Sequence, residues 1–247
     1  MIKDIEFLLK KIFFSEKYLL HKRLKRALKG NYEDELKIIN RFSDKSKDAV
    51  DIGVYRGVYS YELAKHFKKV HSFEPNPLIY PYLIKNLPKI ISNITLYNYA
   101  LSDKNSDAIL KLPLRSKSLF KSNVEEIFKL GTASIHKDNK LNNYKSFTVK
   151  TMKLDDLNLQ NNIGFIKIDV EGHEKNVLYG AETTIKNNMP TMLIEIEQKH
   201  TNKPVIETIN MVESYNYNTF VFEKNELISI NNYKNLEKKR NFIFIKK

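Results

Sequence analysis

The chain has 247 residues, a length that fits one domain of the doubly wound α/β size or one such domain with an appendage. It contains no cysteine, which excludes a disulfide framework, a thiolate zinc site and a cysteine nucleophile, and makes the reducing cytoplasm the simpler expectation. The formal net charge of +13 favours anionic partners, although a composition rich in Lys, Asn and Ile explains it equally well.

The first part of the chain has a different pattern from the rest, and we expect residues 1–42 to form a basic helical extension. Apolar residues recur at helical spacing in residues 2–13. In residues 18–28 leucines lie on one side of the predicted helix and Lys and Arg on the other, with Gly30 suited to the C-cap. We favour packing of the apolar side on the same chain or in a homodimer. The alternative is peripheral contact of residues 1–30 with the inner face of an anionic membrane.

The main domain is expected at residues 43–247, where short apolar runs alternate with helical patterns from Asp48 onward. This alternation predicts an α/β fold with a mostly parallel sheet and helices on both faces. The predicted strands are residues 49–52, 70–73, 94–99, 163–170, 192–196, 220–222 and 242–245. The predicted helices are residues 59–67, 78–87 (with Pro77 suited to its first turn), 174–186 and 205–214. No apolar run is long enough to span a bilayer, and a secretory signal pattern is missing.

Residues 104–152 interrupt the alternation of strands and helices. Alternating apolar residues predict short strands at 108–112 and 147–152, separated by a polar stretch rich in Lys and Ser. Insertions in α/β enzymes commonly build the substrate side of the site, so we expect this one to do so. We hypothesise that it binds the diphosphate of a nucleotide-linked sugar.

A glycine-containing loop follows the first predicted strand. Gly53 and Gly57 allow the backbone to approach a ligand closely, and the start of the next helix offers amide donors to an anionic group. Asp51 lies two residues before the first glycine, which favours a cationic ligand such as a sulfonium over a pyrophosphate. Alone, this pattern describes an ordinary strand–helix turn equally well.

Glu74 follows the second predicted strand, at the sheet edge where the glycine loop is also expected. A carboxylate there can accept hydrogen bonds from both hydroxyls of a ribose. The next residues, Pro75-Asn76-Pro77, impose a sharp exit from the strand. A nicotinamide-dependent oxidoreductase has the same general geometry, but the three-glycine spacing for a pyrophosphate is missing.

The fourth predicted strand ends in a cluster of ionisable residues, Asp169-Val170-Glu171-Gly172-His173-Glu174. With this cluster the sequence resembles the FkbM family of methyltransferases over residues 48–246. The motifs that carry the resemblance are Val50-Asp51-Ile52-Gly53, Phe73-Glu74-Pro75-Asn76-Pro77, Ala100-Leu101-Ser102-Asp103, Leu154-Asp155-Asp156-Leu157 and Lys167-Ile168-Asp169-Val170-Glu171-Gly172-His173-Glu174. One departure is visible, because bulky residues, Val54-Tyr55-Arg56, follow the first glycine where the family usually has small ones.

The resemblance implies a class I methyltransferase fold, with a Rossmann-like, mostly parallel seven-stranded sheet, that binds S-adenosylmethionine and methylates an oxygen. It implies that Glu74 holds the ribose, that Leu101 and Ser102 flank the adenine, and that Asp169 lies near the methionine end. The full set of expected cofactor contacts is Asp51, Gly53, Tyr55, Gly57, Tyr59, Ser60, Glu74, Pro75, Asn76, Ala100, Leu101, Ser102 and Asp169.

Methylation of a hydroxyl needs a base within hydrogen-bond reach of the acceptor oxygen. The candidates are His173, Asp169 and Glu171, and we hypothesise His173 because the ordinary pKa of histidine suits neutral pH. The alternative is a solvent-facing histidine at a helix start. A divalent metal such as Mg²⁺, bridging Asp169 and Glu195 or Glu197, is a further alternative.

The expected function is therefore O-methylation of a sugar or nucleotide-linked sugar in the biosynthesis of a surface polysaccharide or secondary metabolite. The open alternatives are an RNA methyltransferase, a nicotinamide-dependent oxidoreductase and a non-catalytic binding module. A nucleic-acid partner is not expected, because the basic N-terminal segment carries no aromatic stacking platform.

Overall fold

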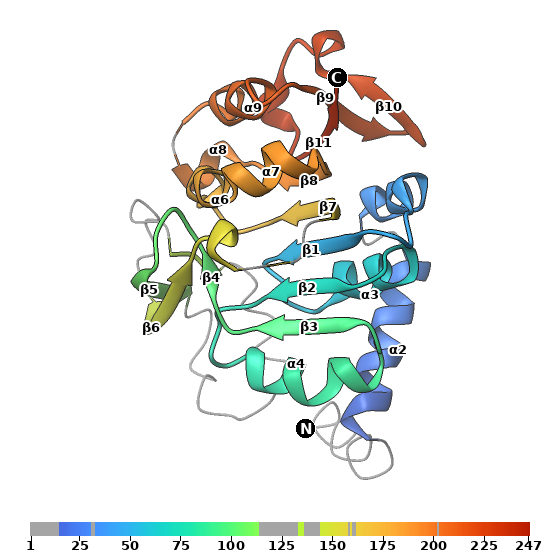
Figure 1. Cartoon of the computed structure of the whole chain (residues 1–247), viewed down its shortest axis with the longest axis vertical. Coiled ribbons are helices and arrows are strands. Elements are labelled where there is room, and N and C mark those ends of the chain that lie inside the picture. Colours follow the sequence, from blue (N-terminus) through green and yellow to red (C-terminus); the bar gives the residue numbers. More distant parts are fainter. Residues whose placement is uncertain are drawn as a thin grey trace, which may run out of the picture.

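The computed structural model describes residues 15–30, 33–113, 133–135, 144–157, 159, 162–201 and 203–247. The predicted helical pattern at residues 2–13 and the polar interior of the insertion lie outside the described residues, apart from residues 133–135. A central sheet carries helices on both faces, and a smaller sheet lies beside the edge where the parallel strands end (Figure 1). None of the described helices is long and apolar enough to cross a membrane.

The central sheet has eight strands in the order β10-β9-β11-β8-β7-β1-β2-β3. Its strands are β1 (Asp48–Ile52), β2 (Val70–Phe73), β3 (Ile94–Tyr97), β7 (Ile163–Ile168), β8 (Thr191–Glu195), β9 (Tyr217–Glu223), β10 (Glu226–Ser229) and β11 (Asn241–Lys246). The five strands from β3 to β8 pair in parallel, and β11, β9 and β10 add to them antiparallel. The predicted class I methyltransferase fold is therefore confirmed.

The predicted count of seven strands is one too low, because β10 was not expected. Lys224 and Asn225 both have positive φ, at 50° and 64°, and they turn the chain so that Glu226–Ser229 folds back on β9. Two consecutive residues with positive φ are typical of the two-residue turns that close hairpins. Lys at the first of these positions is an unusual turn residue, so the composition did not indicate the hairpin.

Helices cover the sheet from both sides (Figure 1). The helices of the described residues are α2 (Glu16–Lys29), η1 (Asp34–Phe42), α3 (Val58–His66), α4 (Tyr80–Asn86), η2 (Leu87–Lys89), η3 (Leu154–Asp156), α6 (Glu174–Gly180), α7 (Glu182–Asn188), α8 (Gln198–Thr201), α9 (Val205–Glu213), η4 (Ile230–Asn232) and η5 (Leu236–Lys238). The side chains of α2, η1, α3 and α4 share one core cluster with the sheet, and those of α6, α7 and α9 share the other.

Two predicted helices differ from the structure. The helix predicted at residues 174–186 is two helices, α6 and α7, joined at Ala181. Gly180 is the last residue of α6, and an added Cβ atom there would lie 1.9 Å from the carbonyl oxygen of Ser102, so only glycine fits against that loop. The helix predicted at residues 78–87 begins at Tyr80, so Pro81 and not Pro77 lies in its first turn, where proline is tolerated.

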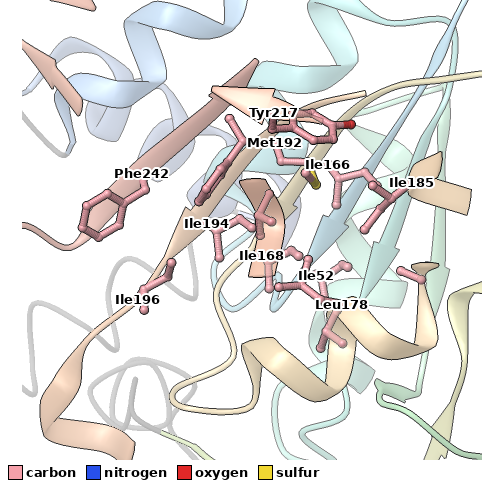
Figure 2. Close-up of a cluster of buried hydrophobic side chains, with 14 of the residues drawn as sticks. Ile52, Ile166, Ile168, Leu178, Ile185, Met192, Ile194, Ile196, Tyr217 and Phe242 are labelled. Atoms are coloured by element: carbon pink, nitrogen blue, oxygen red, sulfur yellow. The ribbon is translucent and has the colours of Figure 1, made fainter. Parts of the chain in front are cut away.

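Each parallel strand alternates its side chains between the two core clusters. In β1, Ala49 packs on the side of α3, whereas Val50 and Ile52 pack on the side of α6. Figure 2 shows the second cluster, in which Ile52, Ile168 and Ile194 from three neighbouring strands lie close to Leu178 of α6. This double-sided burial rigidifies the strand ends that carry the site.

The basic helix α2 packs on its own chain. Leu20 and Leu24 are each 1% exposed and belong to the same cluster as the residues of α3 and α4. Ser15 caps the helix through its hydroxyl, which accepts from the amide of Tyr18, and the amide of Gly30 donates to the carbonyl oxygen of Arg26. The predicted cap and apolar side are therefore confirmed, and the Lys residues remain on the exposed side.

The smaller sheet has the order β4-β6-β5, with β4 at Ala100–Leu101, β5 at Ser106–Pro113 and β6 at Tyr144–Met152. It contains the two short strands predicted at the ends of the insertion, which are confirmed. The strand predicted at residues 94–99 ends at Tyr97 as β3, and β4 is a separate strand of the smaller sheet. Leu110 of β5 and Val149 of β6 are buried against Ala100. The base of the insertion thereby lies beside the carboxyl ends of β1 and β2 (Figure 1).

Candidate active site

A pocket opens where the parallel strands β1, β2 and β7 end, which is the edge at which α/β sheets bind ligands. Its apolar walls come from both sheets and from the segment before α4, and they include Ile52, Phe73, Leu110 and Ile79. The expected cofactor contacts that line it are Gly53, Tyr55, Glu74, Pro75, Asn76, Ala100, Leu101 and Asp169. The candidate bases Glu171 and His173 line it as well, so most of the predicted site comes together around one pocket.

Gly53 makes the approach of β1 to β7 possible. Its φ is +85°, and an added Cβ atom would lie 1.9 Å from the carbonyl oxygen of Asp169. Gly57 caps the start of α3 with φ +77°, and its own added Cβ atom would lie 2.9 Å from the side chain of Leu87. Any side chain at Gly53 would push apart the two strand ends that line the pocket.

Glu74 is held rigidly beside this loop. One carboxylate oxygen accepts from the amide of Tyr55 at 2.7 Å, and the other accepts from the amide of Asn76 at 2.9 Å. The side chain is only 6% exposed, and burial raises the pKa of Glu74 to about 7 against the effect of these two amides. Each oxygen keeps a second lone pair with which it can accept a ligand hydroxyl.

Several expected cofactor contacts lie behind the pocket rather than in its lining. Asp51 is fully buried, and one of its carboxylate oxygens accepts from the hydroxyl of Ser60 at 2.5 Å, while Ser60 contacts the hydroxyl of Ser72 at 2.9 Å. The cause is the alternation of β1, which turns Ile52 toward the pocket and Asp51 toward α3. Gly57 and Tyr59 also lie outside the lining.

Lys167 is a site residue that sequence reasoning missed. Its Nζ lies 2.9 Å from Oδ2 of Asp169 and 3.4 Å from the carbonyl oxygen of Gly53, and it stands 4.9 Å above the ring of Tyr59. Burial lowers the pKa of Lys167, but Asp169 and Asp51 outweigh burial and raise the pKa above its usual value. A lysine within an otherwise apolar strand was the available signal.

A cation of the protein itself, Lys167, lies near Asp51, for which the sequence predicts a cationic ligand. Lys167 is 5% exposed and supplies positive charge to Asp51 on one side and Asp169 on the other. It contacts one oxygen of Asp169 and the carbonyl oxygen of Gly53 at the same time. Lys167 therefore orients two walls of the pocket without being among the residues that line it.

His173 reaches the pocket from the start of α6 and is oriented by a short chain of hydrogen bonds. The hydroxyl of Ser102 donates to Asp103 at 2.9 Å, and the same oxygen lies 2.9 Å from Nε2 of His173. Because that hydroxyl already donates to Asp103, it accepts from Nε2, and this contact fixes the orientation of the ring. Ser102, expected beside adenine, instead orients the histidine.

Glu171 is less suited to act as a base. Its carboxylate lies 2.7 Å from Nε2 of His200, and its carbonyl accepts from the hydroxyl of Ser134 at 2.7 Å. Burial lowers the pKa of His200, but the ion pair with Glu171 outweighs it and raises the pKa. The backbone of Glu171 has φ +53°, a conformation that this pair of contacts stabilises.

The described residues contain no group of three or more His, Asp or Glu side chains arranged to hold a metal ion. Lys167 pairs with Asp169, and Lys199 pairs with Glu197 at 2.5 Å. Burial raises the pKa of Glu195 to about 9, which disfavours the charged form that a divalent cation needs. The geometry does not support the expected alternative of a metal bridge.

Comparison with known proteins supports the interpretation as a methyltransferase. The family model described as the methyltransferase FkbM domain matches residues 51–219, from the glycine loop to β9. The chain belongs to the FkbM methyltransferase family. This match favours a methyltransferase over the nicotinamide-dependent alternative. A search of curated proteins finds no match.

A solved FkbM methyltransferase from Methylobacillus flagellatus KT is 17% identical, with a TM-score of 0.51, and the alignment covers 82% of this chain but 44% of that one. The chain thus spans less than half the length of that relative, with which it shares the fold. A TehB-like SAM-dependent methyltransferase from Corynebacterium glutamicum is 10% identical, with 94% and 98% coverage and a TM-score of 0.45. A SAM-dependent methyltransferase from Aquifex aeolicus is 13% identical, with 94% and 97% coverage and a TM-score of 0.45.

Proposed function

We propose that this FkbM-family protein is an S-adenosylmethionine-dependent O-methyltransferase whose acceptor is a hydroxyl of a sugar. The observation that carries the proposal is a single pocket that has a buried carboxylate, Glu74, at the end of β2 and an oriented imidazole, His173, after β7. The first is suited to hold a ribose, and the second is suited to receive a proton from an acceptor hydroxyl.

The residues of the pocket fit S-adenosylmethionine chemically. Gly53 leaves room for close backbone approach, Glu74 keeps acceptor capacity for two ribose hydroxyls, and Leu101 with Ile79 offers apolar surface to a purine. When bound, the cofactor supplies an electrophilic methyl group on a positively charged sulfur. Asp169, held in place by Lys167, contributes a carboxylate at the other end of the same pocket.

Proton removal is assigned to the imidazole of His173. The chain Asp103–Ser102–His173 holds this ring in one orientation at the pocket. Asp103 also stabilises the imidazolium formed when His173 takes the proton, because its carboxylate lies at the end of the chain. Ser102 and Asp103 are positioning residues in this scheme.

The sugar class of the acceptor rests on the family resemblance, and RNA is the competing acceptor. The test combines calorimetry with S-adenosylhomocysteine and transfer of labelled methyl groups to free sugars, nucleotide-linked sugars and RNA. Methylation of a sugar supports the proposal, whereas methylation of RNA alone contradicts the acceptor class. Failure to bind S-adenosylhomocysteine contradicts the function itself.

The assignment of His173 has its own test. His173→Ala should lower turnover by about 10²–10⁴-fold, with the affinity for S-adenosylhomocysteine unchanged, because the base acts only on the acceptor. The matched control is His21→Ala on α2, where the ring contacts Tyr61 away from the pocket, and it should keep native turnover. Native turnover in His173→Ala would move the role to another residue.

A further inference from the structure

An open cleft lies between η1 and the strands β9 and β11, and the proposed function leaves it unused. Its polar lining includes Glu33 before η1 and Glu35 within it, Lys224 after β9, Lys238 of η5, and Arg240 and Asn241 at the start of β11. The amino end of β11 lies at the same edge of the sheet as the carboxyl ends of the parallel strands, because β11 pairs antiparallel with β8. The cleft therefore opens on the edge that carries the cofactor pocket.

The strand register sets the distance between the two sites. Asp169, which lines the pocket, follows β7 directly, and Glu195 ends the adjacent β8, which pairs with β7 as Ile168 with Ile194. Glu195 in turn pairs with Asn241, which lines the cleft. Two strand spacings of roughly 4.8 Å thus separate Asp169 from Asn241, or about 10 Å in all. This backbone spacing is comparable to the length of one small molecule.

A chain of side-chain contacts also joins the two sites. Asp169 pairs with Lys167 at 2.9 Å, Lys167 stands 4.9 Å above the ring of Tyr59, and the hydroxyl of Tyr59 donates to Glu33 in the cleft. Lys167 and Tyr59 are buried, and the position of Glu33 is tied to that of Asp169 through them. The wall between pocket and cleft is therefore polar and ordered.

Four acidic and four basic side chains line the cleft, and they differ in how they are paired. The acidic side chains are engaged: Asp34 pairs with Lys37, Glu223 pairs with Lys239, and Glu33 accepts from the hydroxyl of Tyr59, while burial raises the pKa of Glu35. Among the described residues, no ion pair is formed by Lys224 or Lys238, and Arg240 reaches Glu197 only at 3.8 Å with 64% of its side chain exposed. Three cations are thus available to a ligand.

We propose that this cleft binds the diphosphate of a diphosphate-linked sugar, with Lys238 and Arg240 as its main contacts, so that the sugar extends toward Asp169. The inference rests on the proposed methyltransferase function and specifies its acceptor. It places the diphosphate on the β9–β11 side of the site, whereas the sequence led us to expect it in the insertion. The distance of about 10 Å spans a diphosphate and one sugar ring.

The test measures binding of inorganic pyrophosphate by calorimetry in the presence of saturating S-adenosylhomocysteine. The double variant Lys238→Gln/Arg240→Gln should bind pyrophosphate at least about tenfold more weakly than the native chain, because it loses two charged donors. The matched control is Lys22→Gln/Lys25→Gln on the exposed side of α2, which changes the net charge equally and should keep native affinity.

Equal pyrophosphate affinity in the native chain and the cleft variant, or equal weakening in both double variants, overturns the proposed site. The affinity for S-adenosylhomocysteine is measured separately for each protein. If the native chain does not bind S-adenosylhomocysteine, the proposed function is contradicted, whereas the comparison of pyrophosphate affinities still tests the cleft. Competition between pyrophosphate and either a nucleoside-diphosphate sugar or a short prenyl-diphosphate sugar then distinguishes the two sources of the same diphosphate chemistry.

Discussion

Two opposing effects act on the pKa of Glu74. The side chain is buried, which disfavours its charged form, and it accepts two backbone hydrogen bonds, which favour that form. Burial dominates and raises the pKa of Glu74 to about 7, so the side chain exchanges its proton near neutral pH. Ribose hydroxyls would add donors to the same carboxylate and favour ionisation further. Cofactor binding and deprotonation of Glu74 are therefore expected to be linked.

This linkage gives a pH dependence with a definite sign. The native chain should bind S-adenosylhomocysteine more tightly at pH 8 than at pH 6, because protonation of Glu74 below about pH 7 removes acceptor capacity. Glu74→Gln should weaken binding at pH 8 by about ten- to a hundredfold and flatten the dependence. Calorimetry at three pH values checks this, and the same slope in both proteins would assign it to another group.

Single residues also mark the limit of sequence reasoning. Gly53 and Glu74 could be predicted because each follows a strand that the apolar pattern identifies, and strand ends on one edge meet. The side to which Asp51 turns could not be assigned, because both faces of β1 are buried and the pattern shows no polar face. Lys167 was missed for the same reason.

At the scale of elements, the turn from β1 to α3 contributes Gly53 and Tyr55 to the pocket lining. Gly53 and Gly57 both have positive φ, and Tyr55 between them has φ +50° while its amide donates to Glu74. The bulky residues after the first glycine therefore do not prevent the loop from closing against β2. They leave the close approach to β7 entirely to Gly53.

Gly53→Ala should therefore reduce both folding and binding. A side chain there meets the carbonyl of Asp169 and requires an unfavourable φ. We therefore expect a loss of about 1–3 kcal/mol in the free energy of unfolding and binding of S-adenosylhomocysteine that is weaker by at least about tenfold. Urea denaturation and calorimetry measure the two effects.

Gly30→Ala is the control for this substitution. Gly30 ends α2 with φ −89°, and its nearest contact for an added Cβ atom is the carbonyl oxygen of Arg26 at 3.3 Å. It lies on the surface, so the free energy of unfolding should change by no more than about 0.5 kcal/mol. A native-like Gly53→Ala would show that the close approach of β1 and β7 is dispensable.

For the molecule as a whole, the carboxyl edge concentrates buried acids. Burial raises the pKa of Glu74 and of Glu174 to about 7 and that of Glu195 to about 9. In the unfolded chain these groups ionise near the ordinary glutamate pKa of about 4.3. Between that value and the raised pKa, the folded chain holds protons that the unfolded chain has released, so these groups favour folding at low pH and lose that contribution as pH rises.

The free energy of unfolding of the native chain should accordingly fall from pH 5 to pH 8.5. In Glu195→Gln the fall over the same range should be smaller by more than about 1 kcal/mol. Glutamine keeps a donor toward Glu197 without a titrating proton. Urea denaturation at several pH values measures the difference. Glu226→Gln on the exposed part of β10 is the control and should keep the native slope, and an equally steep slope in Glu195→Gln would contradict the expectation.

The amino-acid sequence by itself determined the alternation of strands and helices, the sheet edge that carries the site, and the glycine loop with Glu74. These features depend on local periodicity and on the rule that parallel strand ends share one edge. Only the tertiary structure decided that Asp51 turns away from the pocket, that Lys167 joins Asp169 to the loop, and that a cleft lined by charged side chains lies two strands from Asp169. Those relations depend on which face each side chain takes in a sheet buried on both sides, and on pairing between strands far apart in the chain.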